Sequence, residues 1–393
     1  STMSSESHNG FSVTTPYVAS IDGNLTPLNN LSNPFPDGLR QPSGAADGLM
    51  TLIGQGVSYT ATDRRMPIAQ QYQFSIQREL PGQTLWETAY AGSRIEDLPV
   101  NRPMNAIPEQ YRAAAEQTLR NTGRNVLNDT FPNPFRGLIA TGPLAGATVT
   151  RAQLLRPFPH FTGITEIAAP VGSSRFDSLQ VKVNKRMSHG LSVTSAYTWG
   201  KLLERTRFLN DQDTRPVKEL NANDIPHRLV VSGIYELPFG PGKRVGAGTR
   251  GIAARLLENM QFNVVYMAQS GVPLDVVGAE SVGRSAKLPT DQRTVDNWFD
   301  RTAFRLRQPL ELTKTARLPD VRSAGKNNFD ISFFKTTQIS EAVRLQFRAE
   351  SFNAMNRPEW SSPTTAFTNA NFGRVLSTNT FSRQFQFALK LLW

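Results

Sequence analysis

Short segments in which apolar and polar residues alternate recur along the chain, and this pattern constrains the fold most strongly. Successive side chains of a β-strand point to opposite faces, so strict alternation predicts strands with one apolar and one polar face. Nine segments show it, at 70–78, 84–92, 175–186, 191–200, 227–237, 261–269, 328–337, 343–351 and about 380–393. The sequence therefore predicts an all-β protein.

The connections between these segments are of two kinds. The first eight segments form four pairs, three of them joined by short polar turns such as MSHG at 187–190 and the third pair by a longer, Gly/Pro-rich connection. Short turns between alternating segments predict antiparallel hairpins. Between the pairs lie long polar segments, and short turns alternating with long loops are typical of outer-membrane barrels. We therefore expect an antiparallel transmembrane β-barrel with short periplasmic turns and long external loops, the latter at 93–173, 201–226, 270–327 and 352–379.

Composition excludes several other classes of protein. The chain has no cysteine, which rules out disulfides, thiol catalysis and cysteine-ligated metals. No apolar run approaches the roughly 18 residues of a transmembrane helix, and hydrophobic residues make up 39% of the chain. The net charge of +11 comes from basic residues that form no block, so nucleic acid is not an expected partner.

The strand count also carries information about chain organisation. We divide the chain into a leading irregular, external segment at 1–68 and a single barrel domain at 69–393. If the carboxyl end is periplasmic and the long loops are external, nine strands place the leading segment on the external side. The opening STMSSESHNG has no signal-peptide pattern. We therefore expect further strands, a plug and a signal peptide upstream, in a longer parent protein.

Several phrases of the sequence are typical of one family of barrels and occur in that family's order. They are SNPFPDGL (32–39), QQYQFSIQRELPG (70–82), TAYAGSR (88–94), QLLRPFPHFTGI (153–164), SLQVKVNKRMSHGLSVTSAYTWGK (178–201), DIPHRLVVSGIYELPFGPGK (224–243), QSGVPL (269–274), NFDISFFKT (328–336) and LQFRAESFNAMNRPEW (345–360). With these phrases the chain resembles the Oar-like TonB-dependent receptors, which carry a carboxypeptidase-regulatory-like domain at their N-terminus. The resemblance implies a plugged barrel of about 22 strands, an N-terminal box that contacts TonB, and energy-coupled uptake of a ligand bound by external loops.

Two sets of residues are candidate functional sites. The alternating end of the chain resembles the signal that the barrel-assembly machinery reads, with Trp393 where Phe is more usual. Charged residues on polar strand faces are candidates to face the lumen, where they would contact a plug or ligand, or pair with one another. Aromatic residues near strand ends, Trp86, Tyr90, Tyr197 and Trp199, are expected in a membrane-interface girdle. The first set is Phe385, Phe387, Leu389, Leu391 and Trp393, and the second is Lys182, Arg186, Arg344, Arg348 and Glu350.

Other motifs do not support an enzyme or a cofactor site. GPGKRVGAG (240–248) fits neither phosphate-loop spacing, and NDQDTRP (210–216) lacks the Gly and Glu of a calcium loop. The four histidines lie far apart, and no serine has a recognisable nucleophile motif. We expect no catalytic residue, metal or cofactor, and a place in the bacterial outer membrane in contact with its lipid. Two alternatives stay open, a soluble secreted β-rich binding or adhesion protein and a small passive porin.

Overall fold

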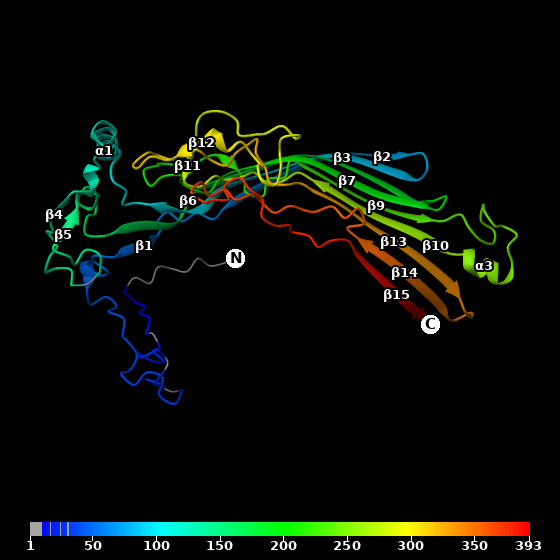
Figure 1. Ribbon diagram of the computed structural model, residues 1–393, viewed down its shortest axis with the longest axis horizontal. Coiled ribbons are helices and arrows are strands. Elements are labelled where there is room, and N and C mark those ends of the chain that lie inside the picture. The colour runs from blue at the N-terminus through cyan, green and yellow to red at the C-terminus, as the bar shows by residue number, and fades with distance from the viewer. Residues whose placement is uncertain (1–9, 16, 24, 30, 141) are drawn as a thin grey trace.

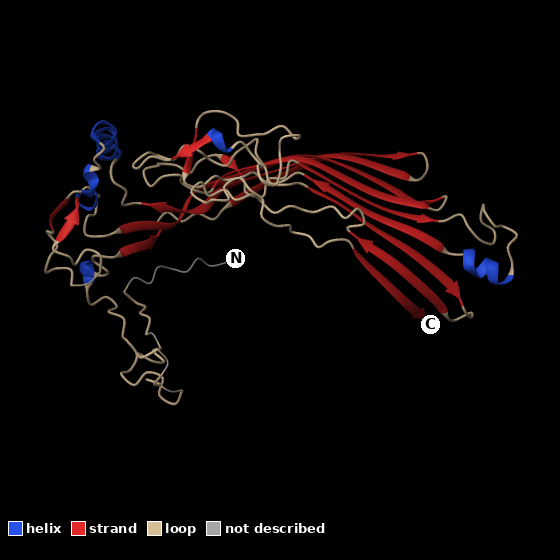
Figure 2. Ribbon diagram, in the orientation of Figure 1, coloured by secondary structure: helices blue, strands red, loops and turns tan. Residues whose placement is uncertain are grey.

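One large twisted sheet dominates the computed structural model, which describes residues 10–393 apart from 16, 24, 30 and 141 (Figures 1 and 2). In this part of the chain, eleven strands belong to the sheet, and the strands along its main path are antiparallel to their neighbours. Their order is β15 (Gln384–Leu392), β14 (Arg344–Phe352), β13 (Lys326–Gln338), β10 (Met260–Gln269), β9 (His227–Glu236), β7 (Leu191–Arg205), β6 (Gly163–Ser188), β3 (Thr84–Pro103) and β2 (Ile68–Leu80).

These nine strands are the nine segments predicted from alternation, so the large antiparallel sheet is confirmed. Strands next to each other in the chain are next to each other in the sheet, as in a meander. The sheet ends at β15 on one side and at β2 on the other, and no described strand joins these two edges. A closed barrel therefore remains a prediction. None of the helices among the described residues is long and apolar enough to cross a membrane.

The pairing register sorts side chains onto two faces. Tyr90, Leu179 and Trp199 are directly opposite one another on β3, β6 and β7 and form one row. At the other edge, the rings of Phe347 and Phe387 stack with centroids 6.4 Å apart. Large apolar side chains on this face are widely exposed, as expected for a wall that meets lipid rather than a protein core. We call it the apolar face and the opposite one the polar face.

Strands β3 and β6 continue far beyond the predicted segments, which corrects part of the predicted loop at 93–173. The two strands stay paired to Pro103 and Thr165, through register shifts between Ile95 and Arg102. Alternation does not predict this extension, because apolar residues such as Ile164, Ile167 and Val171 do not alternate regularly with polar residues there. Strand β1 (Gly56–Thr60), inside the segment expected to be irregular, pairs with the start of β6 in parallel. Residues 1–9, 16, 24 and 30 of that segment lie outside the described residues.

The segments that connect the long strands contain further short strands and helices, most of them at the end of the sheet where β1 lies (Figure 1). Strand β8 (Glu219–Leu220) pairs with β7, and two small sheets stand apart from the main one. Figure 1 shows α1 at the far end of the extended strands, while α3 lies at the opposite end of the sheet. The elements are α1 (Glu109–Thr122), α2 (Arg151–Leu154), α3 (Gly251–Leu257), the 3-10 helices η1 (Gly48–Met50), η2 (Val126–Asn128) and η3 (Arg301–Ala303), and the strand pairs β4 (Thr130–Pro132) with β5 (Thr148–Thr150) and β11 (Ala279–Ser281) with β12 (Phe304–Leu306).

The largest apolar core lies in the loops and not against the sheet. Phe299, Phe304 and Phe372 meet edge to face with ring centroids 5.2 to 6.0 Å apart, and Phe299 is fully buried. These rings come from the segments at 270–327 and 352–379, which the sequence predicts to be polar loops. Burial of aromatic rings stabilises such a cluster beyond what loop hydrogen bonds provide. The two loops therefore form one ordered unit, here called the loop unit.

Candidate functional site

The residues of the predicted assembly signal share one face of the last strand. Phe385, Phe387, Leu389 and Leu391 are on the apolar face of β15, and Phe387 and Leu389 are each 68% exposed. Trp393 follows the last residue of β15 and is also exposed. This arrangement is what recognition of an apolar, edge-exposed strand requires. The role of these residues in assembly remains a prediction.

Four of the five charged residues predicted to face the lumen lie on the polar face, and the fifth, Arg186, falls in the register shift between Lys185 and Ser188. Arg348 is opposite Ala388, and its guanidinium lies 4.8 Å from the ring centroid of Phe334. Its Nε also donates to Gln346 Oε1 at 2.6 Å. Among the described residues, no salt bridge joins any two members of the set, so the expected mutual ion pairing is not found. The others on this face are Lys182, Arg344 and Glu350.

A buried ion-pair cluster, which the sequence does not predict, fastens the loop unit to the sheet. Arg317 binds Glu204 of β7 at 2.6 Å and Glu219 of β8 at 2.9 Å. Arg207 binds Glu219 from the other side at 2.6 Å and also reaches Asp275 at 2.9 Å. The Glu219 side chain is only 1% exposed. We call this group the arginine clamp.

The charged groups of the arginine clamp stabilise each other's ionised forms. Burial alone would raise the pKa of the Glu219 carboxyl, but hydrogen bonds from Arg207 and from the Arg317 backbone N–H hold that pKa below its usual range. The same pairing raises the pKa of Arg207 further above its ordinary value. Both partners are therefore ionised at neutral pH, and a buried charge left alone would cost several kcal/mol.

A second pair repeats this arrangement a few residues farther along. Arg322 donates to the Asp224 carboxylate at 2.6 Å and to the Asp224 carbonyl oxygen at 2.7 Å. Asp224 in turn accepts the Leu202 N–H at 2.6 Å, which satisfies the backbone of β7 where β9 does not reach. The Trp298 indole N–H donates to the Arg322 carbonyl oxygen at 2.7 Å. The apolar core of the loop unit is thereby connected directly to the outer part of β7.

Helix α1 is tied to the same unit through one arginine. Arg112 binds Glu109 and Glu116 within the helix, each at 2.6 Å, and it also donates to the Leu310 carbonyl oxygen. Two carboxylates in the helix therefore hold the guanidinium in place for a contact that lies 198 residues away in sequence. The extended wall, α1 and the loop unit form one connected surface.

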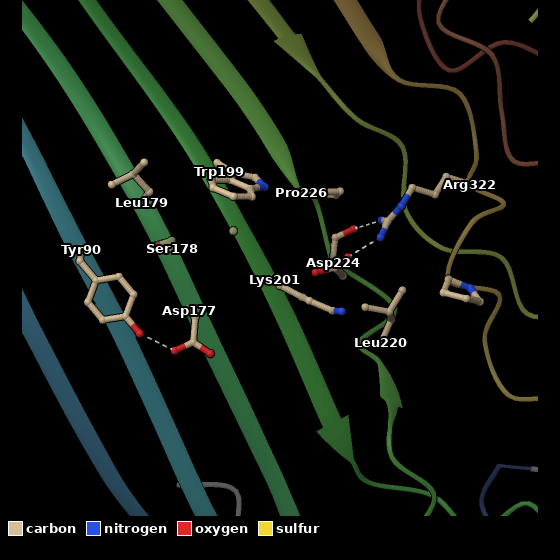
Figure 3. A pocket seen from close by; sticks show the side chains of 12 residues that line it. Tyr90, Asp177, Ser178, Leu179, Trp199, Lys201, Leu220, Asp224, Pro226 and Arg322 are labelled. Atoms are coloured by element: carbon tan, nitrogen blue, oxygen red, sulfur yellow. Dashed lines mark hydrogen bonds and ion pairs between the residues drawn. The ribbon is translucent and has the colours of Figure 1, made fainter.

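A cavity of about 620 Å³ lies where the apolar face meets the loop unit. Figure 3 shows Tyr90, Leu179 and Trp199 on strands of the sheet and Arg322 of the loop unit on the other side, with Leu220 of β8 and Pro226 between them. Its walls are mostly apolar. The cavity opens on the apolar face of the sheet, so a ligand that moves along the polar face would not pass through it.

The charged groups around this cavity are mostly neutralised. The Asp177 carboxylate accepts from the Tyr90 hydroxyl at 2.7 Å and from Arg175 Nε at 2.7 Å. Asp224 pairs with Arg322, as described above. Lys201 projects toward Leu220 and Asp224 in Figure 3, and no salt bridge to it is found within the described ranges.

Sequence reasoning missed the clamp because its members have no characteristic spacing. Glu204 and Arg317 are 113 positions apart, and each stands in a polar segment without a repeating pattern. The available signal was weak: aromatic residues such as Trp298, Phe299 and Phe304 are unusual in a solvated loop. Their presence at 298–304 predicts a core under the loop, but not which charges hold it.

Comparison with known proteins assigns the fold to a family. A model of the outer membrane beta barrel domain family matches residues 1–386. No curated protein sequence matches the chain. Solved structures give remote similarities: FpvA of Pseudomonas aeruginosa bound to pyoverdine at 10% identity and a TM-score of 0.36, the outer membrane transporter YddB of Escherichia coli at 8% and 0.40, and the FrpB iron transporter of Neisseria meningitidis at 10% and 0.38.

The alignments cover most of this chain but only a minor part of each solved structure. The alignments include 82%, 86% and 86% of this chain but only 27%, 34% and 32% of FpvA, YddB and FrpB. The chain thus spans about a third or less of their length, and similarity at these TM-scores supports no conclusion about what it binds. The family match over nearly the whole sequence is the stronger finding. Together with the two-faced antiparallel sheet, it shows that this chain belongs to the outer membrane beta barrel domain family and is located in the bacterial outer membrane.

Proposed function

We propose that the chain is the carboxyl-terminal barrel region of an Oar-like TonB-dependent receptor, a protein whose N-terminus has a carboxypeptidase-regulatory-like domain. Its strands form part of the barrel wall, and its long loops contact an external ligand for energy-coupled uptake. The phrases of sequence shared with that family support this proposal, as does the match to the outer membrane beta barrel domain family. The chain supplies wall and loops, and TonB would act on the region upstream of it.

The ordered loop unit is the observation that carries the proposal. Loops that only connect strands need no core, whereas this unit buries aromatic rings and is fastened to the wall by Arg317 and Arg322. Surface loops that are held rigid in this way are a common platform for binding. A fixed external surface above one end of a membrane wall is suited to ligand capture. We therefore assign ligand contact to the loop unit and α1.

The proposed partners follow from this placement. Outer-membrane lipid covers the apolar face, and the barrel-assembly machinery recognises the last strand. The ligand is unidentified. FpvA and FrpB are described as binding pyoverdine and as an iron transporter, respectively, and those properties are not transferred to this chain.

Uptake by cells with and without the parent gene tests the proposal. Cells would be grown on a complex nutrient mixture, and the compounds removed from the medium would be identified by mass spectrometry. The proposal expects at least one compound to be removed only when the gene is present and TonB is functional. A TonB deletion strain, and a wild-type strain treated with a protonophore, are the matched controls.

Two results would oppose the proposal. Gene-dependent uptake that continues without TonB would favour a passive porin, which is the alternative for a plug-free barrel.

Loss of uptake should also follow deletion of the loop unit with the wall retained. Full, TonB-dependent uptake in that deletion variant would show that the ligand is bound elsewhere.

A further inference from the structure

The connection between β9 and β10 differs from the other hairpin turns because it contains a helix, α3. Figure 1 shows α3 at the end of the sheet opposite to α1 and the loop unit. In the proposed orientation this end is periplasmic. The segment includes the Gly-rich stretch at 240–248, for which the sequence offers no phosphate-loop role. Its position and surface indicate a different use.

Lys335 places α3 on the apolar side of the sheet. This residue is opposite Met260 and Phe347 in the register, and Phe347 is in turn opposite Leu389, so Lys335 lies on the apolar face near the end of β13. Its ammonium group donates to the Arg255 carbonyl oxygen at 2.7 Å and to the Glu258 carbonyl oxygen. Arg255 is in the last turn of α3 and Glu258 is its C-cap residue, and a cation is favoured at this end of a helix. The carboxyl end of α3 is therefore fixed to the side of the wall that meets lipid.

The helix then turns its apolar side chains away from the protein. Ala254 is buried, whereas Ile252 is 80% exposed and Leu256 is 63% exposed. Ile252 and Leu256 are four positions apart and share a side of the helix, while Ala254, two positions from each, lies on the opposite side. Two large aliphatic side chains thus project outward next to a membrane-facing wall.

Basic residues flank this apolar pair in the sequence. Arg244, Arg250 and Arg255 are exposed, and the described residues give none of the three a salt-bridge partner. Lys243 is the exception, at 3.4 Å from Glu236. Aliphatic residues flanked by unpaired arginines on a short helix fit the boundary between acyl chains and phosphate headgroups.

We infer that the segment at 238–259 docks on the membrane leaflet at the short-turn end of the sheet, with Ile252 and Leu256 in the acyl boundary and Arg244, Arg250 and Arg255 on anionic phospholipid headgroups. The choice of lipid rests on charge complementarity and on the position of α3 against the apolar face. The helix anchors the wall at a set depth. The identification of this leaflet as the periplasmic one rests on the orientation in the proposed function.

This chain has no cysteine, so a single label can be placed in it at a chosen position once any cysteine elsewhere in the parent protein has been replaced by serine. The full-length parent protein would be placed in nanodiscs of phosphatidylcholine with or without phosphatidylglycerol. Ile252→Cys would carry an environment-sensitive fluorophore, and quenching by nitroxide lipids would be compared with quenching by iodide in water. Leu389→Cys on the apolar face and Gln346→Cys on the polar face are the matched positive and negative controls.

The inference expects lipid quenching at Ile252 to be at least about half of that at Leu389, because an interfacial helix sits only some 5–10 Å deep. In bilayers with phosphatidylglycerol, each of Arg250→Gln and Arg255→Gln should lower the docked-to-undocked ratio about fivefold. Neither arginine belongs to the clamp or the loop unit.

Other outcomes overturn the inference in distinguishable ways. One such outcome is that iodide quenches the Ile252 label as strongly as the Gln346 label while lipid still quenches the Leu389 label. That result would refute lipid docking and would favour a protein partner for this side of α3. Docking that is equal with and without phosphatidylglycerol, and unchanged in both arginine variants, refutes the anionic headgroup contact. Absence of lipid quenching at Leu389 itself would instead contradict the apolar face as the membrane surface, and with it the proposed function.

Discussion

Gly92 lies on the apolar face of β3, beneath the ring of Tyr72 on the neighbouring strand. A Cβ atom at position 92 would be only 2.3 Å from a carbon of that ring. The ring is held by its hydroxyl group, which donates to the Asp177 carboxylate at 3.2 Å. Glycine thus lets an aromatic ring lie across a strand in the part of the wall where Tyr90 contacts the same carboxylate.

Gly92→Ala should displace the Tyr72 ring and destabilise the protein. The expected loss is about 1 kcal/mol in the free energy of unfolding, because the Tyr72 ring is 43% exposed and can move aside at the cost of its hydrogen bond. Urea unfolding of the full-length protein in detergent, followed by tryptophan fluorescence, measures it. Gly163→Ala on β6 is the matched control, since nothing lies within 4 Å of its added Cβ. Equal unfolding midpoints for the two variants would refute the close fit.

Among the elements, the arginine clamp has the largest single effect on loop order. Arg317→Met should free the loop unit from β7 and β8, because it leaves Glu204 and Glu219 buried without their shared cation. The expected cost is about 3–5 kcal/mol. Limited proteolysis should show faster cleavage at 206–226 and 307–325, with the strands still protected.

The control for that variant is an exposed ion pair in the same loop unit. Arg284 binds Asp300 at 2.7 Å, and its side chain is half exposed. Arg284→Met should change the cleavage rate little, since such pairs contribute about 0–1 kcal/mol. Similar cleavage of the Arg317 and Arg284 variants would mean that the clamp does not hold the loops.

The clamp also predicts a dependence on pH. The folded-state pKa of Glu219 is lowered from its ordinary value of 4.5, so its contribution is complete above that value. That contribution is lost as the pH falls through the lowered pKa of the folded state. Proteolytic protection of 206–226 should therefore stay constant from about pH 7 to about pH 4.5 and decrease below it. Glu219→Gln should already be less protected at neutral pH and give a flatter profile; an unchanged profile would exclude Glu219 as the titrating group.

The elements differ in how far the sequence could predict them. Alternation predicts the long strands because lipid on one face and polar groups on the other leave a regular pattern, as in Phe385 to Leu391. It does not predict β1, which is only five residues long, or the outer part of β6, where apolar and polar residues do not alternate regularly. Nor does it predict the arginine clamp, since contacts between Arg317 and Glu204 depend on how two loops fold over each other. Local pattern thus predicts the wall, and tertiary packing determines the site.

For the whole molecule, the face of the last strand should decide whether the wall assembles. Phe387→Ala combined with Trp393→Ala in the parent protein should reduce heat-modifiable barrel in the outer membrane to less than half. The reason is that assembly is expected to read the apolar side chains of β15, which stay exposed at the sheet edge. Gln386→Ala with Leu392→Ala changes the opposite face and should assemble normally. Normal amounts of barrel in the first variant would rule out this role.

The length of β6 determines which part of the protein is reached first from outside the cell. From Leu179, in the row of Tyr90 and Trp199, β6 continues back to Gly163, and at about 3.3 Å per residue this is roughly 50 Å of strand. In the proposed orientation, the extended strands hold α1 and the loop unit away from the bilayer. Large particles outside the cell, antibodies and phages among them, would therefore contact α1 and the loop unit before any other part of the chain. An antibody against 109–122 should therefore stain intact cells, whereas one against 238–259 should stain only cells whose outer membrane has been opened.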